Sequence, residues 1–505
     1  MKQEGRTQKV AVNVAYNFLN QLLNFVLSFL SRTVFIYVFG AQYLGLNGLF
    51  ADVLGVLSLA ELGFSTAMVY NLYQPLVEHD EKRISELIAF YKKVYQIIAL
   101  IVLFLGLAVM PFLPFLVNLE QAIPNMEWYY FFSVINVVCS YLCAHKSALF
   151  IADQKNYVIA KLSMLINGVK IILQILAAVL WKDYTLYLLV GTCGVLVNGI
   201  VILRKAKKQY PYLISTDMIS REEKTEILKN FSSIFIYKIS SVLLNATDNI
   251  LISVLVGTVA VGYYSNYLMV QSQLVIFYSI IFTSATASIG NLIIKESVER
   301  RYEVFESEQS ISFVLCGIVV PCYVSLINDF IELWAGKSYV LPLGVIFAIG
   351  VNLYLSCVLQ PLWTYREATG LYQKTKWVML ICAVLNLVLS VVFGLCIGIA
   401  GIVLASALSR LLTYVWYEPM ILYHDYFLKT PFEYYGKIIT NAGITTGLTG
   451  IGIFMSAQYP VKTIFEFLCK ASCFFFISLI LMLCIYGRSR GMCYVIDKVR
   501  RMVRG

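Results

Sequence analysis

Six small polar side chains recur at helical spacing within an apolar segment near the N-terminus. Because a helix turns about 100° per residue, steps of three and four residues place them on one face. They are Asn13, Asn17, Asn20, Asn24, Ser28 and Ser31. An amide in hydrocarbon without a partner costs several kcal/mol, so this face requires a polar environment. Amides and hydroxyls are suited to hydrogen-bonding neutral, polyhydroxylated molecules.

Five cations also lie within apolar segments, where each costs about 2.5 to 3.5 kcal/mol near the centre of a spanning helix. They are Arg32, Lys170, Lys238, Arg410 and Lys470. Three of them belong to polar helical faces, namely Ser163, Asn167, Lys170 and Gln174; Lys238, Ser241, Asn245 and Asp248; and Ser406, Arg410, Thr413 and Tyr417. These faces predict a water-filled cavity whose cations provide a positive field, suited to holding a diphosphate.

Each polar feature also has a structural interpretation. The deep cations could form ion pairs with Asp52, Glu61 or Asp248. Arg32 and Lys470 lie toward helix ends, where a long side chain can snorkel to the interface. The asparagine face could hold helices together by interhelical hydrogen bonds, worth about 0.6 kcal/mol on average. Asp52 and Glu61 are candidates for ion coupling or gating, although Glu61 could instead cap a kink at Gly63.

Spanning helices must position these residues, because the composition is that of a polytopic membrane protein. The chain has 505 residues, of which 59% are hydrophobic and 13% charged, and its mean hydropathy is +0.76. Apolar windows of about 20 residues predict an all-α integral membrane protein with about fourteen transmembrane helices. These begin near Val12, Leu46, Val94, Trp128, Val158, Tyr184, Phe231, Val259, Ile311, Leu343, Trp377, Gly401, Ile438 and Thr463.

The distribution of positive charge predicts the orientation. With both termini in the cytoplasm, the inside segments hold 31 of the 39 Lys and Arg residues, and the outside loops hold three. This bias follows the positive-inside rule and accounts for most of the net charge of +10, so it does not indicate nucleic-acid binding. The first apolar segment has no signal-peptide cleavage pattern and is expected to remain as the first helix.

Signals for catalysis, cofactors and metals are missing from the sequence. The AGKS at residues 335–338 has Ile331 where a phosphate-binding loop requires glycine, so no ATP site is expected. His79, His145 and His424 lack metal-ligand spacing, and the twelve cysteines lie mainly within spans. A membrane enzyme acting on lipid-linked sugars would usually carry a large outer loop. Here the longest outer segment has roughly 18 residues.

The two halves of the chain show an internal repeat. A shift of 217 residues superposes Gly40 and Gly45 on Gly257 and Gly262, and a shift of 218 superposes the Glu-Lys-Arg at 81–83 on the Glu-Arg-Arg at 299–301. The repeat predicts two similar six-helix lobes, residues 1–210 and 211–425, around a central cavity. Residues 426–505 add two further helices and a basic tail. Parallel repeats of this kind place a substrate path between them.

The sequence GLNGLFADVLGVLSLAELGFSTAMVYNLYQPL at residues 45–76, together with the six-plus-six-plus-two layout and short loops, resembles a transporter family. It is similar to the Wzx-type flippases, the polysaccharide transporters of the multidrug/oligosaccharidyl-lipid/polysaccharide (MOP) exporter superfamily. The resemblance implies two helical lobes that move undecaprenyl-diphosphate-linked oligosaccharide repeat units across the bacterial cytoplasmic membrane by alternating access, for cell-surface polysaccharide such as capsule. Lipid II flippases and multidrug exporters share the fold.

We therefore expect a flippase for a lipid-linked glycan, with membrane lipid and polysaccharide polymerase machinery as further partners. Its expected binding residues are Asn17, Asn20, Asn24, Ser28, Arg32, Asn167, Lys170, Lys238, Ser241, Asn245, Asp248 and Arg410. The alternative is a multidrug exporter, whose cationic cargo would favour acids in the cavity. Here deep cations outnumber deep acids. A membrane enzyme and a purely structural protein are the weaker alternatives.

Overall fold

The computed structural model describes residues 4–58, 64–119, 123–213, 219–220, 236, 239–244, 246–283 and 286–494. For residues 4–20, 65–67, 287, 288, 291, 294 and 372 it describes the backbone alone. The chain divides into two compact units, residues 1–262 and 263–505. These compact units do not test the lobe boundaries expected at residues 210 and 425. Those boundaries stay predictions.

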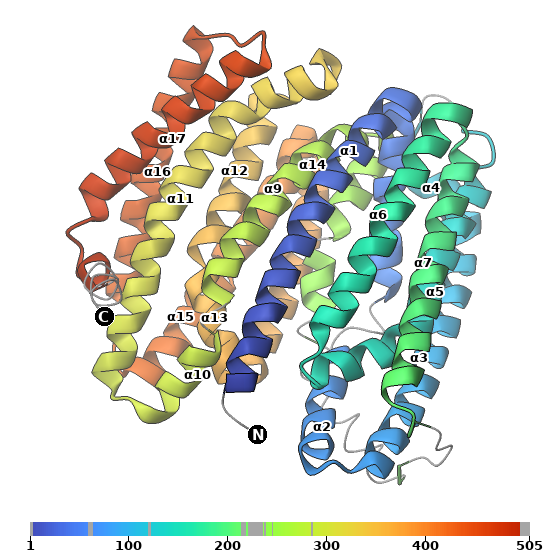
Figure 1. Cartoon of the computed structure of the whole chain (residues 1–505). Coiled ribbons are helices and arrows are strands. Elements are labelled where there is room, and N and C mark those ends of the chain that lie inside the picture. The colour runs from blue at the N-terminus through green and yellow to red at the C-terminus, as the bar shows by residue number, and fades with distance from the viewer. Residues whose placement is uncertain are drawn as a thin grey trace. The chain divides into compact units, whose positions relative to one another are not determined.

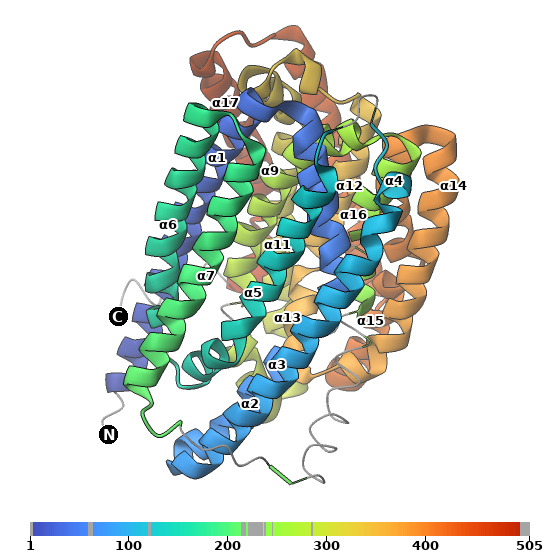
Figure 2. The same cartoon turned by 90° about the vertical axis from the view of Figure 1, so that its right-hand side faces the viewer.

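The first unit is built from long helices joined by short turns. They are α1 (Glu4–Leu57), α2 (Phe64–Glu78), α3 (Glu81–Val109), the short η2 (Met110–Phe112) and α4 (Leu113–Leu116), α5 (Met126–Ala152), α6 (Asn156–Trp181) and α7 (Tyr184–Gln209). A further apolar helix covers Ile239–Leu255, and the first residues of α9 complete the unit. Within it α1 packs on α6, α6 on α7, and α5 on both α3 and α7, as Figures 1 and 2 show.

The second unit is arranged around one long buried helix. Its elements are α9 (Thr258–Thr283), α10 (Thr286–Lys295), α11 (Val298–Ala335), η3 (Lys337–Tyr339), α12 (Leu343–Val358), α13 (Gln360–Thr369), α14 (Tyr372–Leu412), α15 (Tyr414–Leu422), η4 (Tyr423–Phe427), α16 (Phe432–Gln458) and α17 (Ile464–Tyr486). Helix α11 packs against α12, α16 and α17. It therefore forms the core of this unit.

The all-α membrane fold is confirmed in the part of the chain that is described, which contains no strand. Ten helices there are long and apolar enough to span a membrane, or eleven if α12 and α13, bent by 44°, form one span. Two of them each cover two predicted spans, because α1 breaks at Gly40 and α14 breaks at Ile397 and Gly398 without a loop. The count of fourteen stays a prediction.

Charged and polar residues at the helix ends explain where several helices begin. Asp80 accepts a hydrogen bond from the Arg83 amide at the start of α3, and Asp183 caps α7 in the same way. Thr463 and Glu466 form a reciprocal capping box at the start of α17. Such caps satisfy amides that have no partner within the helix, so the apolar segments start at defined residues.

The glycines of the internal repeat have matching backbone roles. Gly40 and Gly257 both have positive φ, 77° and 141°, which other residues rarely adopt. A Cβ on Gly45 would overlap the Thr258 carbonyl oxygen and lie 3.1 Å from the Gly262 nitrogen, and a Cβ on Gly262 would lie 3.1 Å from the Gly45 nitrogen. The two repeated glycines therefore pack against each other inside the first unit, where α1 crosses the start of α9.

Candidate functional site

The polar face of α6 lies against small residues of α7. The Gln174 amide donates to the Tyr187 carbonyl at 3.1 Å, and the Ser163 hydroxyl donates to the Asn198 side chain at 3.4 Å. Between these contacts, the aliphatic stem of Lys170 occupies the space where Gly194 has no side chain. The face thus packs along α7, which the spacing in the sequence did not reveal.

The surroundings of the Lys170 ammonium group differ from those of its packed aliphatic stem. The residue is half-buried near the middle of α6, and it has no ion-pair partner among the described residues. Asn167, one turn earlier, is also half-buried, and its side chain makes no hydrogen bond within that part of the chain. A cation and an amide at this depth require water or a polar ligand. They form the candidate site of the first unit.

The polar face of α1 is adjacent, because α1 packs on α6. Asn24 and Arg32 are half-buried and Ser28 is exposed. The Ser31 hydroxyl lies 3.5 Å from the Tyr187 hydroxyl. The predicted faces of α1 and α6 therefore meet at Tyr187, which sequence reasoning missed. The side chains of Asn13, Asn17 and Asn20 lie outside the described part of the structure.

Asp52 is held by an amide rather than by a cation. The Asn249 side chain donates a short hydrogen bond to the Asp52 carboxylate, which joins α1 to the helix at Ile239–Leu255. No cation pairs with Asp52 among the described residues. Sequence reasoning did not identify Asn249 as a site residue, although the repeat shift of 217 residues aligns it with Arg32.

The repeated polar face is only partly described. Ser241 and Asp248 are half-buried in the helix at Ile239–Leu255. Lys238 and Asn245 lie outside the described residues, as does Glu61. The roles predicted for these three stay predictions.

Arg410 is a predicted binding-site cation that lies in the second unit. It lies half-buried in the part of α14 that follows the break at Gly398. One guanidinium nitrogen donates to the Ser356 hydroxyl at 3.4 Å, while Nε is buried without a hydrogen-bond partner. No carboxylate pairs with Arg410 in the described chain. Like Lys170, it has unused hydrogen-bonding capacity.

Two other cations of the second unit are paired with carboxylates. Lys470 donates to the Asp329 carboxylate at 2.6 Å and to the carbonyls of Ser456 and Tyr459, and its side chain is 8% exposed. One guanidinium nitrogen of Arg366 donates to both carboxylate oxygens of Glu418, at 2.8 and 3.1 Å, with both side chains buried. Neither Asp329 nor Glu418 was among the acids considered as partners from the sequence. These pairs are structural.

The second unit also contains an apolar cavity of about 360 Å³ between α11, α12, α15 and α16. Its walls are mostly aliphatic and aromatic side chains. None of the predicted binding residues that the structure describes lines this cavity. Among the described residues, no group of three or more His, Cys, Asp or Glu side chains could hold a metal ion.

Comparisons with known proteins indicate what kind of molecule carries these sites. The sequence model of a family described as "Polysaccharide biosynthesis protein" matches residues 10–289, more than half of the chain. Curated proteins give no significant match in sequence.

Solved structures share the fold at low sequence identity. A structure of the lipid II flippase MurJ in an inward closed conformation has a TM-score of 0.70 and 13% identity, and the match covers 95% of this chain and 99% of that one. An inward-facing MATE-family multidrug resistance transporter of the MOP superfamily has a TM-score of 0.58 and 13% identity, with coverages of 80% and 96%. The MATE multidrug transporter DinF-BH, in complex with R6G, has a TM-score of 0.55 and 14% identity, with coverages of 83% and 97%.

Proposed function

Because the chain belongs to the polysaccharide biosynthesis protein family and has the fold of MOP-superfamily flippases and transporters, we propose that it translocates a lipid-linked oligosaccharide. The proposed cargo is an undecaprenyl-diphosphate-linked repeat unit, moved across the bacterial cytoplasmic membrane by alternating access. Both termini would then lie in the cytoplasm, and a polysaccharide polymerase would use the product in assembling cell-surface polysaccharide such as capsule, as Wzx-type flippases do. The fold is that of transporters and not of membrane enzymes.

The observation that carries this proposal is the unpaired charge of Lys170. A half-buried ammonium group within a spanning helix is costly, and this one has no ion-pair partner among the described residues. A diphosphate would offset that cost through charge-assisted hydrogen bonds, which are roughly twice as strong as neutral ones. Asn167 and the amide and hydroxyl groups of α1 would bind the sugar hydroxyls. The geometry of Arg410 supports the same role in the second unit.

A multidrug exporter remains the second candidate because of Asp52. Its half-buried carboxylate has an amide partner and no paired cation in the described chain, so it could attract a cationic compound or a coupling ion. The proposals differ in the sign of the charge that binds cargo. A flippase for lipid diphosphates depends on Lys170 and Arg410, and an exporter of cations depends on Asp52.

Mass spectrometry of the gently purified protein separates the two proposals. We expect a co-purified polyprenyl diphosphate sugar whose amount falls in Lys170→Met, a change that keeps the stem over Gly194 and removes the charge. Lys182→Met, at an exposed cation in the turn between α6 and α7, is the matched control and should not change that amount. Binding of cationic compounds that requires Asp52, with no such lipid in any preparation, would refute the flippase proposal.

A further inference from the structure

A polar pocket of about 820 Å³ lies at one end of the second unit, apart from the residues discussed above. Three separate segments form it, namely the first turns of α11, the chain just before α16 and the chain that follows α17. Its cations are Arg300, Lys429, Arg488 and Arg490. The proposed transport function leaves this pocket without a role.

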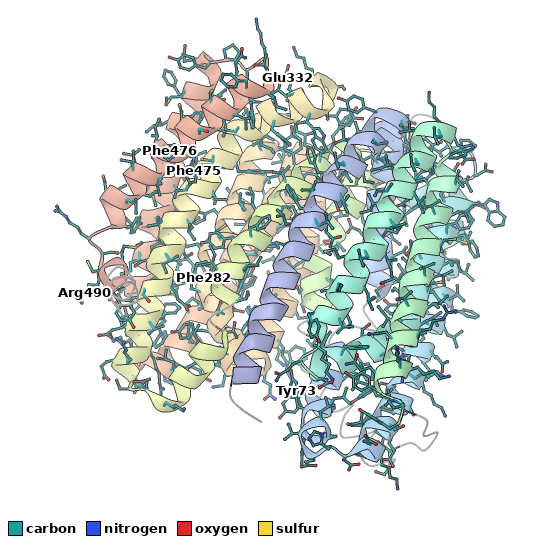
Figure 3. All side chains as sticks on the ribbon, viewed as in Figure 1. Tyr73, Phe282, Glu332, Phe475, Phe476 and Arg490 are labelled. Atoms are coloured by element: carbon teal, nitrogen blue, oxygen red, sulfur yellow. The ribbon has the colours of Figure 1, made fainter. Side chains whose placement is uncertain are left out.

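The pocket lies at the depth of lipid headgroups. Helix α17 has 23 residues and a rise of about 1.5 Å per residue, so it is long enough to cross the roughly 30 Å hydrocarbon layer. Arg488 and Arg490 follow its last residue, Tyr486, within one turn. Lys429 precedes the first residue of α16 by three positions. Figure 3 shows Arg490 near the end of the unit where α17 finishes, and Glu332 at the opposite end of α11.

The segment that follows α17 packs on α11. A Cβ on Gly491 would overlap the Glu306 carbonyl and the Ser310 hydroxyl, so the backbone lies directly against the helix. Met492 is buried in an apolar cluster with Val314, Ile318 and Met482. This packing places Arg488 and Arg490 at the pocket.

The charges in the pocket are not balanced. Arg300 is paired with Glu303 at 2.8 Å, donates to the Tyr494 hydroxyl at 2.8 Å and stacks on the Tyr494 ring at 4.8 Å. Two further acids line the pocket. Glu306 is paired with Lys437, which lies outside the pocket, and the other acid is Glu299. A positive excess therefore remains.

Three cations, Lys429, Arg488 and Arg490, then face one remaining lining acid, Glu299, which lies close enough to Lys429 to attract it. The Lys429 ammonium lies 3.5 Å from the centre of the Tyr302 ring, and neither Arg488 nor Arg490 has an ion-pair partner among the described residues. The tyrosine ring orients Lys429 by a cation–π interaction and does not neutralise it. Lys429, Arg488 and Arg490 are thus available to an anion.

We propose that this pocket binds the phosphate of an anionic phospholipid headgroup from the surrounding leaflet. Arginine side chains are well suited to phosphate because their planar forks donate two parallel hydrogen bonds. Clustered cations at a membrane surface attract anionic lipid. The acyl chains would lie along the exposed apolar face of α17, where Phe475, Phe476 and Ile480 are located. Inorganic phosphate has no such chains and should bind more weakly.

Native mass spectrometry of the full chain in neutral detergent tests this proposal with phosphatidylglycerol as the probe. We expect one saturable phosphatidylglycerol whose affinity falls by more than tenfold in the Lys429→Ala/Arg488→Ala/Arg490→Ala variant. The matched control removes three exposed cations at the end of α7, Lys205, Lys207 and Lys208. Its affinity should stay within about twofold of the unchanged protein, because those side chains lie outside the pocket.

Three outcomes would overturn the proposal. An equal loss in both triple variants would show general attraction to a positive surface. Equal binding of phosphatidylcholine would show that the anionic charge is irrelevant. Displacement of the lipid by millimolar inorganic phosphate would indicate a site for a free anion.

A native thiol provides a second measurement that needs no substitution. Cys493 lines the pocket and is exposed, so bound phosphatidylglycerol should slow its labelling by a water-soluble maleimide. Phosphatidylcholine, which has no net charge, is the control lipid and should not slow the labelling of Cys493. Unchanged labelling of Cys493 at saturating phosphatidylglycerol would place the lipid elsewhere and refute this site.

Discussion

Lys170 and Lys470 are the same residue type in similar apolar segments, yet their surroundings are opposite. Lys470 is enclosed by a carboxylate and two carbonyls and is almost fully buried. Lys170 has a packed stem and an ammonium group with no ion-pair partner in the described chain. A charge within a spanning helix is therefore not functional by itself. The partners of the charge decide whether it is available to a ligand. The same contrast separates Arg366, which is paired with a carboxylate, from Arg410.

The largest expected effect comes from breaking the ion pair whose two side chains are both buried. Glu418→Leu leaves Arg366 without its carboxylate, and breaking such a pair costs about 3 to 5 kcal/mol, so the melting temperature in detergent should fall strongly. Arg366→Met/Glu418→Leu should recover much of the loss. Glu303→Ala, which breaks the exposed pair with Arg300, is the control and should cost less than about 1 kcal/mol. A small effect of Glu418→Leu would mean that the pair is not structural.

Lys470→Met should also destabilise the protein, by about 3 kcal/mol, because among the described residues Asp329 then keeps only the Ser456 hydroxyl at 3.3 Å. Thermal melting measures the loss, and Asp329→Asn in the same chain should reduce it. Binding of the lipid-linked cargo by the folded fraction should be unchanged. Weaker binding with normal melting would place Lys470 in the transport site and remove the contrast with Lys170.

Lys170→Met should have the opposite pattern. Loss of one charge-assisted contact, worth roughly 1.5 to 3 kcal/mol, should weaken apparent affinity for the lipid-linked cargo about tenfold to a hundredfold. Melting should change little, because the methionine keeps the packing over Gly194. Cargo binding and glycan export are measured beside Lys182→Met. Normal export in Lys170→Met would exclude this residue from the binding site.

Arg410→Met should weaken cargo binding about tenfold, near the lower end of the range expected for Lys170→Met, because one guanidinium nitrogen already donates to Ser356. Removing the charge also removes the unsatisfied Nε, so stability should not decrease. Binding and melting are measured as for Lys170. Collapse of folding would show that Arg410 has a structural partner instead.

Much of the fold could be predicted from the sequence, and the exceptions have a physical reason. Apolar length predicts spanning helices, because each must bury its own backbone hydrogen bonds in lipid. The predicted starts near Leu46 and Gly401 follow the breaks at Gly40 and Gly398 closely. The number of separate helices was less predictable, since a single non-helical glycine can redirect the chain without any polar loop.

The candidate site could be predicted only in part. Helical spacing correctly placed Ser163, Asn167, Lys170 and Gln174 on one face, since that depends only on the turn per residue. The spacing does not tell which helix the face meets, and the faces meet at Tyr187 and the small residues of α7. The partners of Lys470 and Arg366 come from 141 and 52 residues away.

The sequence by itself determined that this chain spans the membrane many times and where polar faces lie along its helices, and it predicted that the two halves are related. These properties depend on local composition and on a repeat, which need no knowledge of the neighbouring helices. Only the tertiary structure decided which cations are neutralised, because an ion pair forms between side chains that folding brings within a few ångströms. For that reason Lys170 and Arg410 remain candidates for binding cargo, whereas Lys470 and Arg366 hold the second unit together.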